Sequence, residues 1–230
     1  MKGFGYVFGL LLLSICSCKS GNKQNMTTNE EADSEQGFEL TIDPEELVVR
    51  TMTERFQAVD EDLLKEQEEF HLMILEDSSE EEKDEYIKWF YANVAHIDSI
   101  GTQVTELMKQ KKYAELVNLM EKEMGNFQSH PSCDNYVAYD INCIMAFLYQ
   151  KTIPDQTQLY KKLIPLWEMN LVRIRAVQYN WEEFHPLYET VLNDLWIYYN
   201  QVGDSVNRNK IHEELDYING LKHAMYNFEE

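Results

Sequence analysis

The sequence predicts an all-α fold, built from antiparallel helical hairpins that stack as a short solenoid or as a bundle. Apolar residues recur at three- and four-residue spacing along most of the chain, and no convincing run shows the two-residue alternation of a strand. The 230 residues include only nine Gly and five Pro, too few for the many turns of an all-β fold. We therefore expect a helical domain over residues 43–230.

The first helix is expected to begin after Asp43, because aspartate is a favoured N-cap residue and Pro44 suits the first helical position. Its apolar face extends to about Leu75. A second helix begins with the capping-box sequence of residues 79–82 and is expected to break near Gly101. The apolar positions are Val48, Met52, Phe56, Val59, Leu63, Phe70 and Ile74 in the first helix and Tyr86, Phe90, Val94, Ile97, Val104 and Met108 in the second.

Two shorter helices follow. Residues 113–124 predict a third helix, and residues 135–150 predict a fourth that Asp134 caps. Cys143 would lie about 13 Å along the axis of this helix, at 1.5 Å per residue. No disulfide with Cys133 is expected, because the Cα atoms of a disulfide lie within about 7 Å of each other. The apolar face of the fourth helix contains Val137, Ile141, Ile144 and Leu148.

Proline and glycine divide the C-terminal part into three helices. Pro165 lies within the apolar pattern of residues 156–178 and is expected to kink or restart that helix. Pro186 lies near the start of a helix that ends at about Val202. Gly203 and the aspartate after it predict a stop and a new start. The apolar face of the last helix contains Ile211, Leu215, Ile218, Leu221 and Met225.

Two stretches, residues 104–120 and 195–215, resemble degenerate tetratricopeptide repeats, because each joins two helices across a short polar turn. Tyr199, four residues before Gly203, matches the tyrosine of the family's first helix. Arg208 stands where the family has a small residue, and no 34-residue period is present. The resemblance implies stacked helical hairpins, and a plain antiparallel bundle is the alternative.

The N-terminus has the pattern of an export signal. Residues 3–15 are uncharged and too short to span a bilayer, which needs about 20 apolar residues, but they fit the apolar region of a signal peptide. The residues that follow resemble the lipobox of bacterial lipoproteins, in which a small residue precedes the cysteine that is acylated. Ser17 precedes Cys18, whereas a bulky isoleucine precedes the alternative, Cys16. The resemblance implies a signal peptide over residues 1–17 and lipidation of Cys18; an ordinary secretory signal or an uncleaved anchor is the alternative.

Residues 18–42 are expected to comprise the acylated cysteine and a flexible tether. Residues 19–37 are polar, with Met26 as their one large apolar residue, so they bury too little surface to offset the entropy of ordering. Lys19 replaces the aspartate that often retains such lipoproteins in the inner membrane. The resemblance therefore implies a lipid anchor in the outer membrane of a Gram-negative envelope, on its periplasmic or surface face.

The net charge is strongly negative. The chain has 20 Lys and Arg against 41 Asp and Glu, and loss of Lys2 with the signal peptide leaves 19 − 41 = −22. No basic cluster is longer than residues 109–112, so nucleic acid is a poor partner. The same charge repels an anionic lipid surface, so membrane contact is expected through the lipid alone. The expected partners are other envelope proteins, among them a basic protein.

Two Glu-x-x-His pairs, at residues 68–71 and 182–185, have the spacing of di-iron carboxylate sites in helical bundles. Chance pairs are expected in a chain this rich in glutamate, and Pro186 follows the second pair. Residues 212–216, HEELD, contain half of a zinc-peptidase signature, but Asp216 replaces the second histidine. We expect solvated helix faces at all three places, with no bound metal and no cofactor.

Residues 130–135, HPSCDN, group a histidine, a cysteine and an aspartate, which could bind a metal or hold a nucleophile. A turn that ends at the capping Asp134 is the alternative, and we expect that turn. The chain has no phosphate-binding glycine loop, no nucleophile elbow and no paired cysteines of the zinc type. We therefore assign no catalytic residue and expect a protein that is not an enzyme.

Aromatic residues are concentrated between positions 181 and 199, where they are candidates for a groove that binds a sugar or a peptide. At helical spacing, core packing is the alternative. Two short stretches around Ser99 and Ser205, of the form Asp-Ser-apolar, resemble a sequon for periplasmic O-glycosylation. The candidate groove residues are Trp181, Phe184, Tyr188, Trp196 and Tyr199.

These features favour an envelope-anchored lipoprotein that acts as a non-catalytic helical scaffold for binding other proteins. The alternative is an acidic immunity or inhibitor lipoprotein that neutralises a toxin in the periplasm, because an acidic surface steers basic partners towards it. An enzyme with a di-metal or cysteine site is a third class, which no catalytic motif supports.

Overall fold

The computed structural model describes residues 42–177 and 186–226, and every regular element in these ranges is a helix. The predicted all-α class is confirmed. No helix in these ranges is both long enough and apolar enough to cross a membrane. The elements are α2 (Pro44–Val49), the π-helix η1 (Arg50–Arg55), α3 (Glu61–Ile74), α4 (Glu80–Lys109), α5 (Tyr113–Gln128), α6 (Asn135–Thr152), α7 (Gln156–Val177), α8 (Pro186–Val202) and α9 (Ser205–Tyr226).

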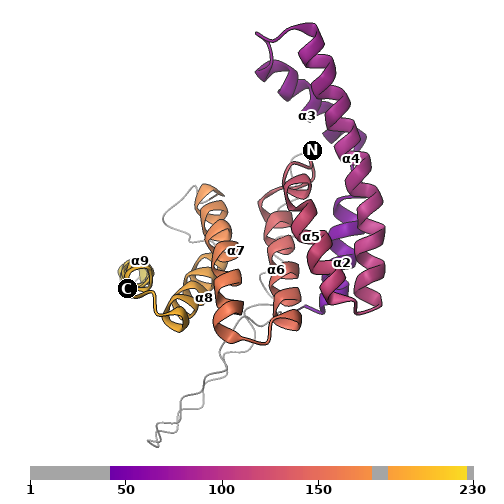
Figure 1. Cartoon of the computed structure of the whole chain (residues 1–230). Coiled ribbons are helices and arrows are strands. Elements are labelled where there is room, and N and C mark those ends of the chain that lie inside the picture. The colour runs from indigo at the N-terminus through magenta and orange to yellow at the C-terminus, as the bar shows by residue number, and fades with distance from the viewer. Residues whose placement is uncertain (1–41, 178–185, 227–230) are drawn as a thin grey trace, which may run out of the picture.

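Helices α4 to α9 form a row in which each helix packs mainly against the one before it and the one after it (Figure 1). This is the arrangement of stacked helical hairpins. The helices α2 and η1 depart from it, because both pack against α4 and α6. A salt bridge between Arg50 of η1 and Asp140 of α6 (3.1 Å) reinforces this contact. The N-terminal segment thereby joins helices that are not neighbours in the sequence.

Three predicted helix starts are confirmed by their caps. The carboxylate of Asp43 accepts hydrogen bonds from two backbone N–H groups in the first turn of α2. Ser79 and Glu82 form the reciprocal capping box of α4. Asp134 accepts from two N–H groups at the start of α6. These side chains satisfy backbone donors that have no partner inside the helix.

The turns at α4–α5 and α8–α9 have the same backbone form. Lys111 (φ 55°) and Gly203 (φ 76°) are both left-handed. In each turn the N–H of the following residue bonds to the carbonyl five residues earlier, at 3.0 and 2.9 Å. Glycine adopts this conformation without strain, whereas lysine does not. The predicted stop at Gly203 is confirmed, and Lys111 shows that the first turn achieves the same ending at a conformational cost.

The expectation of one helix from Asp43 to about Leu75 is wrong. Residues 56–60 are not helical, and Asp60 caps a new helix, α3, by accepting a hydrogen bond from a backbone N–H (2.9 Å). Phe70 and Ile74, expected on the core face, are exposed on α3. Asp60 and the two acidic residues after it are a helix-start signal that the longer apolar periodicity masked.

The expected break at Gly101 is also wrong, because α4 is continuous there. A Cβ atom on Gly101 would lie 2.9 Å from the carbonyl oxygen of Met52 and 2.9 Å from the side-chain nitrogen of Gln57. That nitrogen donates to the backbone carbonyl of Asp98 (3.2 Å). Gly101 therefore permits the close approach of η1 to α4 rather than a break in the helix.

Of the two outcomes expected at Pro165, a kink or a restart, the restart is wrong, because α7 continues through this residue. Proline removes the donor for the carbonyl four residues earlier, at Lys161. Both residues are exposed, so water can satisfy that carbonyl. Pro186 begins α8 and Val202 ends it, as the sequence predicts.

The core runs along the whole row of helices. Helix α6 is the most enclosed, with buried residues on several sides, including the predicted positions Val137, Ile141, Ile144 and Leu148. Buried and half-buried polar groups also link neighbouring helices. The side chain of Asn142 donates to Asn170 (2.6 Å) between α6 and α7, and Trp167 donates to Asp194 (2.8 Å) between α7 and α8. Cys133 and Cys143, the two cysteines of the described residues, are not joined by a disulfide.

Candidate functional site

Residues 60–91 form an arm that extends beyond the stacked helices (Figure 1). We call these residues, which comprise α3, the turn after it and the first part of α4, the α3–α4 arm. Helix α3 has six large apolar side chains, and none of its residues is buried. Most helices in proteins owe their stability to burial of an apolar face, so a helix without buried residues leaves an interaction surface open.

Exposed apolar side chains are concentrated on this arm. Of the ten large apolar side chains that are exposed in the described residues, five lie between residues 70 and 91, whereas the others are distributed over α6 to α9. Phe70, Met73 and Ile74 lie at the i, i+3 and i+4 spacing of one helical face, which we call the α3 stripe. The other two exposed side chains, Trp89 and Tyr91, belong to α4.

Ring contacts hold α3 against α4. The His71 ring lies 5.0 Å from that of Tyr86 and 5.8 Å from that of Phe70, measured between ring centroids. The Tyr86 ring in turn lies 5.5 Å from that of Trp89. Tyr91 also donates a hydrogen bond to Glu68 (2.5 Å). Exposed rings on the two helices thus belong to one connected cluster.

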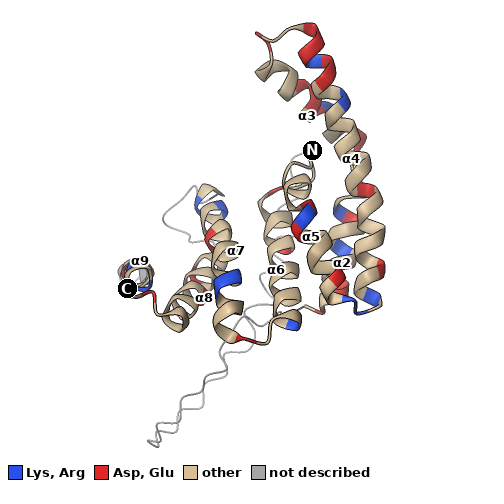
Figure 2. Cartoon of the chain, in the orientation of Figure 1, with Lys and Arg blue, Asp and Glu red and all other residues tan. Residues whose placement is uncertain are grey.

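The arm is also the most acidic part of the molecule (Figure 2). Residues 60–91 contain 13 Asp and Glu and three Lys, so their net charge is 3 − 13 = −10. The full chain has a net charge of −21, so nearly half of it lies on these 32 residues. Exposed Glu66 and Glu69 each lie four residues before a member of the α3 stripe. The surface therefore combines apolar side chains with adjacent carboxylates.

The three predicted groove residues that the structure describes do not come together on an exposed surface. Trp181 and Phe184 lie outside the described residues. Tyr188 and Tyr199 are buried in the core between α7, α8 and α9, and Trp196 is 37% exposed. The two buried rings therefore pack inside the helical row and do not line an open groove.

The hydroxyl groups of these two tyrosines join helices. Tyr188 donates to Glu214 of α9, and Tyr199 donates to Glu168 of α7. Burial is the main cause that raises the pKa of both hydroxyls, and the adjacent carboxylates add to it. The hydroxyls therefore remain protonated donors at neutral pH. Arg175 of α7 also pairs with Glu214 (2.5 Å), which ties three helices together.

The HPSCDN stretch forms the expected turn before α6. His130 is buried, and its ring packs edge-on against Phe56, with 4.9 Å between ring centroids. Burial lowers the pKa of His130 to about 4, and burial raises the pKa of the Cys133 thiol to about 11. The thiol is therefore neutral near pH 7, whereas a nucleophilic cysteine needs its thiolate form.

No cluster of three or more His, Cys, Asp or Glu side chains in residues 42–177 and 186–226 has the geometry to hold a metal ion. The first Glu-x-x-His pair belongs to the arm, where Glu68 accepts from Tyr91 and His71 contacts aromatic rings. The second pair lies outside the described residues. His212 and Asp216 of the HEELD stretch are 3.7 Å apart on an exposed face of α9.

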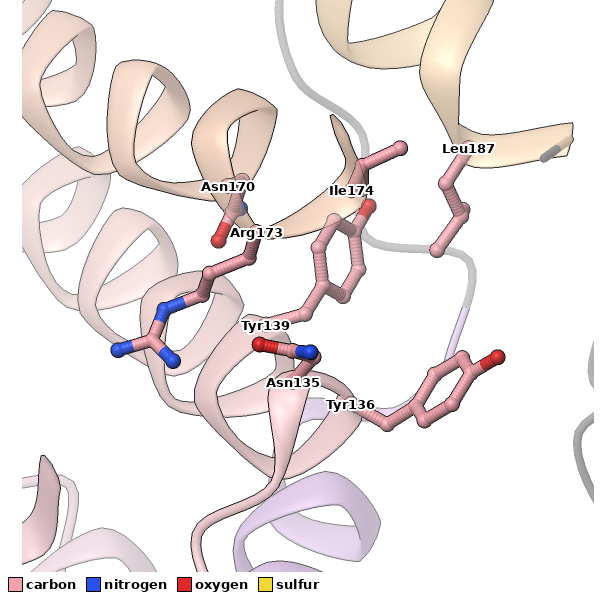
Figure 3. Close-up of a pocket in the computed structure, with 7 residues that line it drawn as sticks. All are labelled: Asn135, Tyr136, Tyr139, Asn170, Arg173, Ile174 and Leu187. Carbon is pink, nitrogen blue, oxygen red and sulfur yellow. The ribbon is translucent and has the colours of Figure 1, made fainter. Parts of the chain in front are cut away.

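A small cavity lies where α6, α7 and the first turn of α8 meet (Figure 3). Its volume is about 10 Å³, close to the least that holds one water molecule. Asn170 and Arg173 line it, and their Nδ2 and Nε atoms are buried without a hydrogen-bond partner in the described part of the chain. The cavity has room for a water molecule but not for an organic ligand.

Comparison of the chain with protein-family models, with curated protein sequences and with solved structures found no significant match. The apolar periodicity of residues 61–74 does not reveal the α3–α4 arm, because the same pattern is typical of a helix face in the core. The signal that could have identified the arm is the dense run of acidic residues on both sides of that face.

Proposed function

We propose that the protein is an envelope-anchored lipoprotein that acts as a non-catalytic helical scaffold and binds another protein through the α3–α4 arm. The observation that carries this proposal is that none of the six large apolar side chains of α3 is buried, and that three of them are exposed. The stacked helices then serve as the rigid support from which α4, a single helix of 30 residues, projects the arm.

Capture of partners by the tagged chain Lys19–Glu230 from envelope and culture fractions tests this proposal. The informative variant is Met73→Ser with Ile74→Ser, since these side chains are 62% and 61% exposed and their loss should not affect folding. The matched control is Val172→Ser with Val206→Ser, because both valines are 64% exposed on other helices. A stoichiometric partner that the control retains and the arm variant loses is expected. Equal capture by both variants would place binding elsewhere.

A second candidate function is that of an inhibitor or immunity protein, and the net charge of −10 on the arm favours it. The identity of the captured partner separates the two functions. A basic toxin whose activity falls on binding would support inhibition, whereas an assembly subunit of the envelope would support the scaffold.

Anchoring has its own test. We expect metabolic labelling with palmitate to mark the wild-type protein and not Cys18→Ala. Label that persists on Cys18→Ala and disappears from Cys16→Ala would move the acylation site to Cys16. An unlabelled wild-type protein would contradict the lipoprotein assignment.

A further inference from the structure

We infer that the docking element of the partner is a basic amphipathic helix that lies along the α3 stripe. The inference rests on the proposed function, and it adds the chemistry of the partner. Three features of the arm carry it: the helical spacing of the exposed apolar side chains, their position outside the stacked helices, and the carboxylates beside them.

The dimensions of the stripe suit a helix. Phe70, Met73 and Ile74 form a single row on α3, and a partner helix with apolar residues at three- and four-residue spacing can pack its own row against it. Together with the flanking carboxylate of Glu66, the row extends about 12 Å along the helix to Ile74, at 1.5 Å per residue. A partner helix of three to four turns therefore covers it fully.

The charge beside the stripe selects the partner. Glu66 and Glu69 are exposed one turn before Phe70 and Met73, where they can meet Lys or Arg side chains that flank an apolar row. Opposite charges on the partner would relieve the repulsion among the 13 acidic residues of the arm.

Other occupants of the stripe are disfavoured by the same charge. A second copy of this chain would bring two arms of charge −10 together. An anionic membrane surface and nucleic acid are repelled for the same reason. Residues 19–41 of this chain contain two Lys and five Asp and Glu, so this segment is itself acidic and is repelled as well.

Three synthetic peptides of about 14 residues, or four helical turns, test the inference with the chain Lys19–Glu230. The first has Leu at three- and four-residue spacing and Lys elsewhere. The second keeps the Leu positions and has Glu in place of Lys. The third has the composition of the first in an order without helical periodicity. Binding is measured by calorimetry at about 20 mM and about 200 mM salt, which changes screening strongly.

We expect the first peptide alone to bind well, and its affinity to fall as salt rises. Met73→Ser with Ile74→Ser should weaken it at least about tenfold, because two apolar side chains lose their burial. Glu66→Lys with Glu69→Lys should weaken it at low salt and flatten the salt dependence. Val172→Ser with Val206→Ser and, for charge, Glu106→Lys with Glu213→Lys are the controls, since all four residues are exposed elsewhere.

Other outcomes overturn the inference in distinguishable ways. Equal binding of the acidic peptide would show that charge does not select the partner. Equal binding of the aperiodic basic peptide, or no effect of the stripe variant, would show that the apolar row does not act. Absence of binding by all three peptides would also overturn it. None of these outcomes decides the proposed function. That function is tested separately, by whether the variant Met73→Ser with Ile74→Ser loses the partner that the wild-type chain captures.

Discussion

The contact between η1 and α4 at Gly101 provides a test of the packing in this structure. A methyl group at this position would lie 2.9 Å from the backbone oxygen of Met52 and 2.9 Å from the side-chain nitrogen of Gln57. The glutamine side chain can rotate away, although it would lose its hydrogen bonds to Asp98 and Thr102 (both 3.2 Å). The Met52 oxygen belongs to the backbone of η1, so it moves only if the helix moves.

The expected magnitude follows from two opposing effects. Alanine in place of glycine in a helix interior is worth about 1 kcal/mol in favour of folding. Overpacking of a buried contact costs about 1–3 kcal/mol. Gly101→Ala should therefore lower the free energy of unfolding by up to about 2 kcal/mol. Gly125→Ala is the matched control, because Gly125 also lies within a helix but has no atom within 4 Å of the added methyl group.

Urea unfolding of both variants, with the midpoint and the slope measured separately, is the assay. Gly125→Ala should raise the free energy of unfolding by up to about 1 kcal/mol, or the Tm by about 2–4 °C. Gly101→Ala should change it in the opposite direction. If Gly101→Ala stabilises the protein as much as Gly125→Ala does, η1 does not lie against α4 as described.

Two further predictions concern the left-handed turns and a buried acid. Lys111→Gly should raise the free energy of unfolding by about 1 kcal/mol and Gly203→Ala should lower it by a similar amount, because both positions are left-handed. Urea unfolding measures both changes, and two changes of the same sign would contradict this reasoning. Burial raises the pKa of Asp194 from 3.8 to about 6, so the folded state favours the protonated carboxyl and stability falls as pH rises through this interval. Asp194→Asn keeps an acceptor for Trp167. At pH 7 it should raise the free energy of unfolding by up to about 3 kcal/mol, and the Tm with it, but at pH 4 it should raise neither. A gain that persists unchanged at pH 4 would rule out the ionisation as its cause.

Local signals in the sequence predicted most helix starts and ends. Asp43, Ser79, Asp134 and Gly203 act within one turn of their own position, through hydrogen bonds or backbone conformation, so their effect does not depend on the rest of the fold. The helices at 135–150 and 186–202 were predicted almost to the residue for this reason. Helical periodicity then identified the buried face of α6 correctly.

Predictions failed where the outcome depends on distant parts of the chain. Gly101 weakens a helix locally, but the approach of Met52 gives it a packing role. Pro165 removes a hydrogen bond, but Lys161, which bears the affected carbonyl, is an exposed residue. The face of α3 with Phe70 and Ile74 has the same period whether it packs inside the protein or against a partner. Periodicity alone could not distinguish these cases, so the arm and its surface required the three-dimensional arrangement.

Because each helix in the row rests mainly on its sequence neighbours, the protein need not open all at once. Helix α9 packs chiefly on α8, so it can detach while the preceding helices keep their contacts. Helices α2 and η1, in contrast, pack against both α4 and α6, so the N-terminal half of the row is expected to unfold as a single cooperative unit. Amide hydrogen exchange should therefore be fastest at the C-terminal end of the row and slowest around Met52. A force applied to the chain from the N-terminal side of Asp43 would act first on its most resistant part.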